Sequence, residues 1–324
     1  MSPLFLYFTI FLCLFKLIGF AEVVEPQAWE KVTPENIRDL TEIQEKLQEL
    51  IPLTSKALVA LETEDGAGSG VIISPDGLIL SAAHVIGRTG VEMEVRLLDG
   101  SRAKAVSLGG SEISDAGMLQ IQGEGPWPYA EIAELGSSHV GDWCFGLGHP
   151  GGFDMERGMV VRMGRIIQKQ DETMQTDSRL LGGDSGGPLF SFKGKVIAIH
   201  SRISKEPDQN FHVPVESFHA NWDFFRDENL LSFEEIEQGG FLGIACEESN
   251  QGLIIRSVIP DTPAEAAGLQ ENDIILKIDN QAVTNREKLT ILISTKEPED
   301  EIKVEYQRDT SVATLKLKLG SRFE

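Results

Sequence analysis

The sequence is poor in cysteine and in positive charge, and both shortages exclude classes of protein. Its three cysteines, Cys13, Cys144 and Cys246, form no CxxC pair and no Cys/His ligand spacing, so neither a disulfide framework nor a structural zinc is predicted. Lys and Arg number 29 against 51 Asp and Glu, which gives a formal net charge of −22. This charge repels phosphate backbones and no Lys/Arg block offsets it, so we expect no nucleic-acid partner.

The long apolar run at the start of the chain predicts export. Residues 3–21 read PLFLYFTIFLCLFKLIGFA, with small residues at 19 and 21 that suit signal peptidase. We expect residues 1–21 to be a signal peptide cleaved near Ala21. The alternative is an uncleaved membrane anchor, because 19 mostly apolar residues nearly span a bilayer. Either interpretation puts the rest of the chain outside the cytoplasm, in the periplasm or secreted.

The 324 residues are enough for two domains at roughly 150 residues each. Residues 22–56 predict an N-terminal segment with an amphipathic helix, which Thr33 would cap and Pro34 would begin. Its apolar stripe has an acidic opposite face, so we expect it to pack on the domain or a neighbouring subunit. The stripe has helical spacing and consists of Ile37, Leu40, Ile43, Leu47 and Leu50.

Two further regions differ in their patterning. From Ala57 to about Val215, short apolar runs alternate with turn dipeptides, which is typical of an all-β barrel or sandwich. A closing amphipathic helix and an acidic interdomain linker over 229–239 are predicted next. From Gly240 the strand and helix patterns alternate, which indicates an α+β module of about 80 residues.

The strongest local signal for chemistry is the segment GGDSGGP at residues 182–188. A serine hydroxyl is a weak nucleophile, so it needs a base to take its proton and donors to hold the oxyanion that forms. Glycines around Ser185 leave room for a substrate and for bare backbone N–H groups. We expect backbone at Gly183, Asp184 and Ser185 to form the oxyanion hole. The alternative is a glycine-rich hairpin without chemistry.

The base and its orienting carboxylate are predicted from their settings. Among six histidines, His84 ends an apolar run in which small Ala82 and Ala83 leave room beside the imidazole. Asp115 begins another apolar strand, where a carboxylate can be partly buried and fix the histidine tautomer. Taken alone, each residue has a structural interpretation, as a core histidine or a strand cap. The other histidines match no common metal-ligand spacing, so no metal site is predicted.

The order His84, Asp115, Ser185 in an all-β region resembles the chymotrypsin-like double β-barrel fold. Closer still is the HtrA (Deg) family of trypsin-like proteases with PDZ domains. The resemblance is carried by GSGVIISPDGLILSAAHVI, SDAGMLQI, GGDSGGPLF and GLIIRSVIPDTPAEAAGLQENDIILKIDNQAV. The family commonly has Asn-Pro before Gly-Asn-Ser, where this chain has Leu181-Gly182 before Gly183-Asp184-Ser185.

The resemblance implies a protease domain over 57–228 and an α+β PDZ domain over 240–320. It also implies a serine endopeptidase, without a cofactor, that degrades unfolded or damaged proteins. Ser185 would attack the substrate carbonyl, and His84 would act as general base and then general acid while Asp115 orients it. By analogy, a substrate pocket near Leu180 and Ile203 would prefer small or medium aliphatic side chains.

In the PDZ region, the resemblance implies a carboxylate-binding loop that takes C-terminal peptides. This loop is Gly240, Phe241, Leu242, Gly243 and Ile244. The alternative is a module used only for assembly. The family also implies a homotrimer built through the protease domains. Two other functions stay open: a PDZ-gated sensor protease with one specific substrate, and a chaperone or binding protein with minor catalysis.

Overall fold

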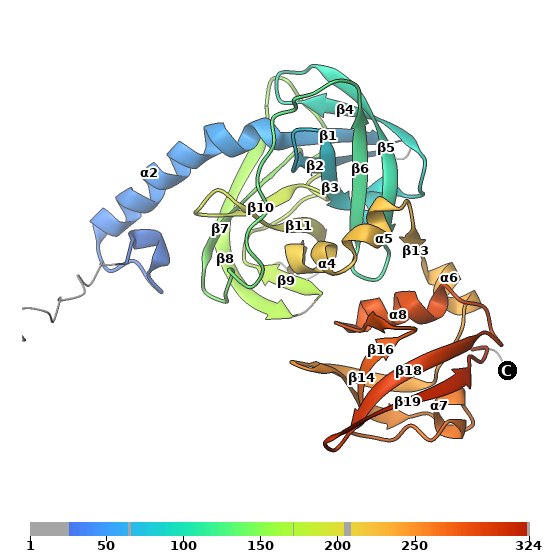
Figure 1. The fold of residues 1–324 in the computed structure, drawn as a ribbon. Helices are drawn as coiled ribbons and strands as arrows, with labels where there is room; N and C mark the ends of the chain where they lie inside the picture. The colour runs from blue at the N-terminus through green and yellow to red at the C-terminus, as the bar shows by residue number, and fades with distance from the viewer. Residues whose placement is uncertain (1–25, 64–65, 171, 204–208, 323–324) are drawn as a thin grey trace, which may run out of the picture.

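A computed structural model describes residues 26–63, 66–170, 172–203 and 209–322, which form a protruding helix, a double barrel and a smaller C-terminal domain (Figure 1). The signal peptide or anchor predicted for residues 1–21 lies outside the described residues. Within those that are described, no helix is long and apolar enough to cross a membrane.

The N-terminal segment contains a short 3-10 helix, η1 (Ala28–Glu30), and the longer α2 (Ile37–Thr54). Helix α2 begins later than Thr33-Pro34 predicts, because Asn36 is its N-cap and accepts a hydrogen bond from the Asp39 N–H at 3.1 Å. The Asp39 carboxylate also accepts from Lys31 Nζ at 3.0 Å, which holds the preceding residues outside the helix. Ile43 and Leu50 are buried, whereas Ile37 and Leu40 remain exposed, so only part of the predicted stripe packs on this chain.

The first barrel consists of six antiparallel strands closed by the pairing of β5 with β6 and of β4 with β1. Strand β3 (LILSA) is buried along its whole length, as expected for a run without polar alternation. The strands are β1 (Leu58–Thr63), β2 (Gly66–Ile72), β3 (Leu78–Ala82), β4 (Glu92–Leu97), β5 (Arg102–Ser111) and β6 (Ala116–Gln122).

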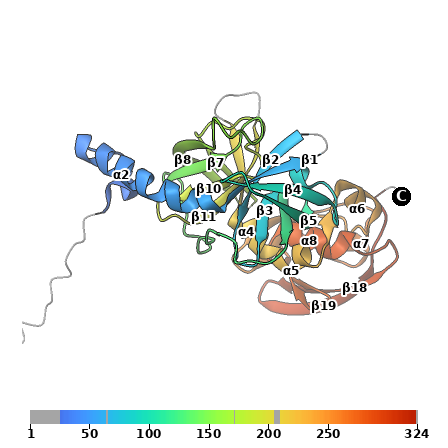
Figure 2. The same cartoon turned by 90° about the horizontal axis from the view of Figure 1, so that it is seen from above.

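The second barrel is also closed and six-stranded, in the order β10-β11-β12-β9-β8-β7. Its strands are β7 (Trp143–Gly148), β8 (Val160–Gln170), β9 (Thr173–Thr176), β10 (Pro188–Ser191), β11 (Val196–Ile203) and β12 (Asn210–Pro214). Inside it, the rings of Phe145 and Phe190 stack 5.3 Å apart. One hydrophobic cluster joins both barrels, and the two lie side by side in Figures 1 and 2. The predicted chymotrypsin-like double barrel is therefore confirmed.

Residues 215–238 contain more regular structure than the predicted helix and linker. Helices α4 (Val215–Ala220) and α5 (Trp222–Arg226) are followed by the short strand β13 (Leu230–Leu231), which pairs in parallel with β5. Helix α6 (Phe233–Gln238) then begins with a capping box between Ser232 and Glu235. Glu235 caps α6, and the Phe233 N–H donates to Glu112 at 2.8 Å, so the acidic segment is ordered between the first barrel and the C-terminal domain (Figure 1).

The C-terminal domain has its own core around a five-stranded path, β14-β15-β16-β18-β19, in which β14 is an edge strand. Helix α8 lies on the side of this domain that faces the barrels (Figure 1). The elements are β14 (Ile244–Ser249), β15 (Gly252–Val258), α7 (Pro263–Ala266), β16 (Ile274–Ile278), β17 (Gln281–Ala282), α8 (Arg286–Ser294), β18 (Glu301–Arg308) and β19 (Ser311–Lys318).

The two domains touch through a buried polar contact. Glu287, in the first turn of α8, accepts a hydrogen bond from Asn221 Nδ2 at 2.5 Å, and both residues are buried. Burial raises the pKa of the Glu287 carboxyl, although the nearby polar groups of Ser111 and Ser114 oppose the increase. These two serines belong to the segment that leads into Asp115, so the C-terminal domain contacts the first barrel next to a predicted catalytic residue.

Candidate active site

His84 and Asp115 are brought together by neighbouring ends of the first barrel. His84 lies on the one-turn helix α3 (Ala83–Ile86), which follows β3, and Asp115 lies in the turn between β5 and β6. His84 Nδ1 lies 2.9 Å from Asp115 Oδ1 and 3.0 Å from Oδ2, and the His84 backbone N–H donates to Oδ1 at 3.1 Å. The carboxylate therefore fixes the ring orientation and leaves Nε2 to accept a proton.

The electrostatics of this pair favour a charged carboxylate beside an accessible imidazole. The hydrogen bond to Asp115 raises the pKa of His84 above its ordinary value, although burial opposes it. Burial would raise the pKa of Asp115, but the hydrogen bonds and charge of His84 and the Ser201 hydroxyl together lower it. The His84 side chain is 52% exposed and that of Asp115 is 12% exposed, so the base can meet a substrate while its partner stays enclosed.

Ser185 reaches the same place from the second barrel. Its carbonyl accepts a hydrogen bond from the Ser69 N–H at 2.8 Å, which ties the nucleophile turn to β2. Its hydroxyl donates to the Ser201 carbonyl at 3.1 Å, and among the described residues no hydrogen bond joins it to His84. The Ser201 hydroxyl donates to Asp115 Oδ2 at 2.5 Å. Ser201 therefore touches two of the three predicted catalytic residues.

Sequence reasoning missed Ser201. The residue lies in β11 among ordinary strand residues (VIAIHSRI), 16 positions after Ser185 and 86 after Asp115, and no local pattern marks it. Only the closure of the second barrel against the first puts its hydroxyl and its carbonyl between the two residues.

The loop before Ser185 leaves two of the three predicted oxyanion donors without a hydrogen bond in the described part of the chain. The Asp184 N–H donates to the Leu181 carbonyl at 3.0 Å, which leaves Asp184 out of the predicted donor set. The N–H groups of Gly183 and Ser185 make no hydrogen bond within the described part of the chain. Gly183 has φ +93°, and a Cβ there would lie 2.6 Å from the Gly151 nitrogen, so glycine is required.

The two residues predicted to line the substrate pocket lie around Asn210 in the second barrel. The Leu180 N–H donates to Asn210 Oδ1 at 2.9 Å, and Ile203 pairs with Asn210 across β11 and β12. Leu180 is buried and Ile203 is 52% exposed. The structure thus brings the pair into one region at the end of β11, next to residues 204–208, which are not described.

The predicted carboxylate loop precedes the edge strand β14. The N–H groups of Gly240 and Phe241 already donate to the carbonyls of Lys296 and Gly320, at 2.7 and 2.9 Å. The N–H groups of Leu242 and Gly243 have no such bond among the described residues, and Gly243 has φ +87°. Two unbonded donors beside Ile244, the first residue of β14, can receive an anionic chain end.

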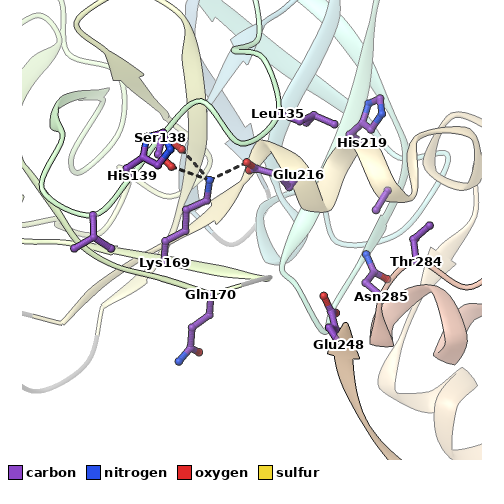
Figure 3. Close-up of a pocket in the computed structure, with 12 residues that line it drawn as sticks. Leu135, Ser138, His139, Lys169, Gln170, Glu216, His219, Glu248, Thr284 and Asn285 are labelled. Carbon is purple, nitrogen blue, oxygen red and sulfur yellow. Dashed lines mark hydrogen bonds and ion pairs between the residues drawn. The ribbon is translucent and has the colours of Figure 1, made fainter. Parts of the chain in front are cut away.

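A cavity of about 600 Å³ lies between the domains and is not part of the triad (Figure 3). Lys169 in it is already neutralised, because its Nζ donates to Glu216 at 2.8 Å and to Ser138 Oγ at 3.0 Å. Thr284 and Asn285, just before α8, line the opposite side. Within the described residues, no group of three or more His, Cys, Asp or Glu could hold a metal ion.

Comparisons with known proteins agree with this geometry. Residues 68–199 match the trypsin-like peptidase domain family and residues 240–319 match the PDZ domain family. A probable periplasmic serine endoprotease, DegP-like, of Pseudomonas savastanoi pv. phaseolicola is 32% identical over 275 residues, covering 78% of this chain and 56% of that protein. One of Rickettsia conorii is 28% identical, covering 94% of this chain and 66% of its own length.

The chain thus spans between about half and two thirds of the length of these curated relatives. Among solved structures, the HtrA-type protease AlgW with a tripeptide has a TM-score of 0.60 at 23% identity and covers 84% of this chain and 96% of its own. The serine endoprotease from Yersinia pestis has a TM-score of 0.56 at 23% identity, with 84% and 97% covered. The chain thus joins a domain of the trypsin-like peptidase family to one PDZ domain, and with these relatives this order supports the predicted resemblance to the HtrA/Deg family.

Proposed function

We propose that this protein is a serine endopeptidase. The observation that carries the proposal is the buried Asp115 carboxylate, which bonds both His84 and Ser201 while the Ser201 carbonyl holds the Ser185 hydroxyl. A single buried carboxylate that orients an exposed imidazole beside a serine in a glycine-rich turn is the arrangement required for acyl transfer.

The proposed reaction begins when the Ser185 hydroxyl turns from the Ser201 carbonyl to His84 Nε2. His84 takes the proton as Oγ attacks the scissile carbonyl, and the oxyanion receives hydrogen bonds from the N–H groups of Gly183 and Ser185. His84 then returns the proton to the leaving amine, and an acyl-enzyme on Ser185 remains. Water then attacks this ester while His84 takes its proton, and His84 returns the proton to Ser185 Oγ as the acid product leaves. The proposed reaction uses no cofactor.

The substrate class we propose is unfolded or damaged protein. The pocket region at Leu180 and Ile203 is aliphatic and adjoins the oxyanion loop, which supports small or medium apolar side chains before the scissile bond. The DegP-like relatives are named periplasmic serine endoproteases, which supports an exported enzyme. From the family resemblance we also propose that the protein is cleaved near Ala21, with retention of residues 3–21 as an anchor as the alternative. The same resemblance supports assembly as a homotrimer through the protease domains.

The PDZ domain is proposed to bind the C-termini of polypeptides. Strand β14 is the sheet edge, so an extended peptide can add to it while its carboxylate meets the Leu242 and Gly243 N–H groups. Similar solved structures include AlgW with a tripeptide and with a decapeptide.

A second candidate function is a PDZ-gated sensor protease with one specific substrate. The observation in its favour is the Glu287–Asn221 contact, which connects α8 of the PDZ domain to the barrel beside the Asp115 segment. A chaperone or binding protein with minor catalysis is less favoured, because it would not need the His84–Asp115 hydrogen bonds.

The test is hydrolysis of denatured casein by the protein without residues 1–21, with Ser185→Ala as its control. We expect cleavage that falls in the variant by something on the order of a millionfold, as the loss of a serine nucleophile does elsewhere. Activity that appears only after addition of hydrophobic C-terminal peptides would favour the gated sensor. Equal activity of both proteins would contradict the proposed function.

A further inference from the structure

The residue immediately before Ser185 belongs to a buried ion pair. Asp184, the residue before Ser185, has a side chain that is 2% exposed. Its Oδ2 accepts hydrogen bonds from Arg162 Nε at 3.0 Å, from Arg162 Nη2 at 2.7 Å and from the Leu181 N–H at 2.9 Å. Arg162 belongs to β8, so this contact joins the oxyanion loop to the wall of the second barrel.

The pair is needed because a carboxylate without a cation is costly to bury. Among the described residues, Arg162 is the cation that bonds to Asp184. The other oxygen, Oδ1, is buried and has no hydrogen-bond partner in the described part of the chain; it lies against Gly148, where a Cβ would be only 2.4 Å away. There is therefore no room at position 148 for a side chain that could bring a second partner to Oδ1.

The position of Asp184 makes this pair relevant to the two oxyanion donors. Asp184 lies between Gly183 and Ser185, and its backbone is bonded on both sides, with its N–H on the Leu181 carbonyl and its carbonyl on the Gly187 N–H at 2.9 Å. A shift of the Asp184 carboxylate towards water would carry this peptide unit with it. Both N–H groups that face the oxyanion would then move.

Arg162 itself cannot follow such a movement. It lies on an eleven-residue strand and is paired with Gly146 of β7 in the barrel ladder. Its side chain is 18% exposed, so it is held on a rigid element and screened from solvent.

We propose that Arg162 is a positioning residue for catalysis, which holds the Gly183 and Ser185 donors in place through the Asp184 carboxylate. This inference rests on the proposed peptidase function and adds a residue to it. Arg162 touches neither the substrate nor the reacting atoms, so its loss should lower kcat while KM changes little. Its effect should also depend on the charge at position 184, because a neutral amide there needs no cation.

The test compares the exported wild-type protein with Arg162→Met, Asp184→Asn and the double variant Arg162→Met/Asp184→Asn. For Arg162→Met we expect kcat on a peptide substrate to fall on the order of 10²-fold or more, as when an oxyanion donor is lost. KM should change by less than about threefold, because the uniform binding of substrate is untouched. The double variant should recover about tenfold or more of the lost kcat, since its buried side chain is uncharged.

The matched control is Arg165→Met, three residues further along the same strand. The guanidinium of Arg165 lies 4.0 Å from the centre of the Trp143 ring and donates to the Gly141 carbonyl, with no bond to Asp184. Its loss should lower the melting temperature without a selective fall in kcat. A fall in kcat for Arg165→Met as large as that for Arg162→Met would show a general structural effect and overturn the proposal.

A second measurement does not need catalysis. Hydrogen exchange of residues 181–187 should become faster in Arg162→Met and return towards the wild-type rate in the double variant. If the wild type cleaves nothing, the proposed function fails, while this exchange pattern still decides whether Arg162 holds the loop. Unchanged kcat and unchanged exchange in Arg162→Met, or a double variant no better than Arg162→Met, would overturn the proposal.

Discussion

His200 Nδ1 and His212 Nδ1 lie 3.0 Å apart inside the second barrel, where both rings are fully buried. Thr176 Oγ1 lies 2.8 Å from His212 Nε2 and completes the chain of polar contacts. Burial lowers the pKa of both histidines, and lowers that of His212 to about 3. The pair is therefore neutral at pH 7, and a hydrogen bond between the rings requires one Nδ1 to donate and the other to accept.

We predict that this pair makes the protein sensitive to acid. In the unfolded chain both histidines have a pKa near 6.5, so between that pH and their lower folded values the unfolded state binds more protons. The contribution of the two buried histidines to the free energy of unfolding is therefore fully present above about pH 6.5. It falls by roughly 1.4 kcal/mol per pH unit for each histidine as the pH is lowered further. Urea denaturation at several pH values between 7 and 5 measures this slope.

The double variant His200→Asn/His212→Val should show a shallower slope over this range, and His219→Gln, at an exposed site, should keep the wild-type slope. An identical pH dependence in all three proteins would contradict the assignment.

The second prediction concerns the pH dependence of catalysis. Because the hydrogen bond to Asp115 raises the pKa of His84, the imidazole is protonated and inactive below a pH that lies above the ordinary 6.5. We expect kcat/KM to rise with pH through this raised value. Asp115→Asn should move the rise to lower pH and reduce kcat by about 10⁴-fold, because the amide favours the wrong tautomer. A pH–rate profile that is the same in both proteins would refute the role of Asp115.

The third prediction concerns Ser201, whose hydroxyl donates to Asp115 while its carbonyl faces Ser185. Ser201→Ala removes only the hydroxyl, so kcat should fall about tenfold to a hundredfold, the worth of a hydrogen bond to a charged group. The pKa of Asp115 should rise, since the Ser201 hydroxyl helps to lower it. Ser217→Ala is the control and should keep its kcat, because this buried hydroxyl has no hydrogen-bond partner among the residues that the structure describes.

Two neighbouring glycines provide the fourth prediction. Gly183→Ala places a Cβ 2.6 Å from the Gly151 nitrogen at a positive φ, so the oxyanion loop must move and kcat should fall on the order of 10²-fold. Gly182→Ala meets nothing within 4 Å and should cost little activity. Steady-state kinetics on one peptide substrate would separate the two, and equal losses would exclude a specific role for Gly183.

The fifth prediction tests the contact between the domains. Glu287→Ala leaves the buried Asn221 amide without its partner, which should cost about 1–3 kcal/mol of the interface. Limited proteolysis within residues 226–240 should then become faster. Glu287→Gln keeps an acceptor and mimics the protonated form that burial favours, so it should resemble the wild type. Equal proteolysis of the Ala and Gln variants would argue against this hydrogen bond.

The sequence predicts the barrels, the C-terminal module and the three catalytic candidates because each depends on local pattern. Buried runs such as LILSA, turn dipeptides and glycines around Ser185 all act within a few residues. Ser201 and Arg162 depend instead on closure of the second barrel, which joins residues with unremarkable neighbours to partners 16 or more positions away. The occupied Asp184 N–H was also beyond sequence reasoning, since it follows from the turn back to Leu181.

Strand β13 has a mechanical consequence for the whole molecule. The chain that leads to the PDZ domain is fastened to the first barrel by hydrogen bonds from the Gly110 N–H to Asn229 and from the Glu112 N–H to Leu231, at 3.0 and 2.9 Å. The chain that leads to the C-terminal domain is therefore attached to the first barrel at the end of β5. Because the turn that carries Asp115 begins where β5 ends, a displacement of this attachment would also displace the predicted orienting carboxylate.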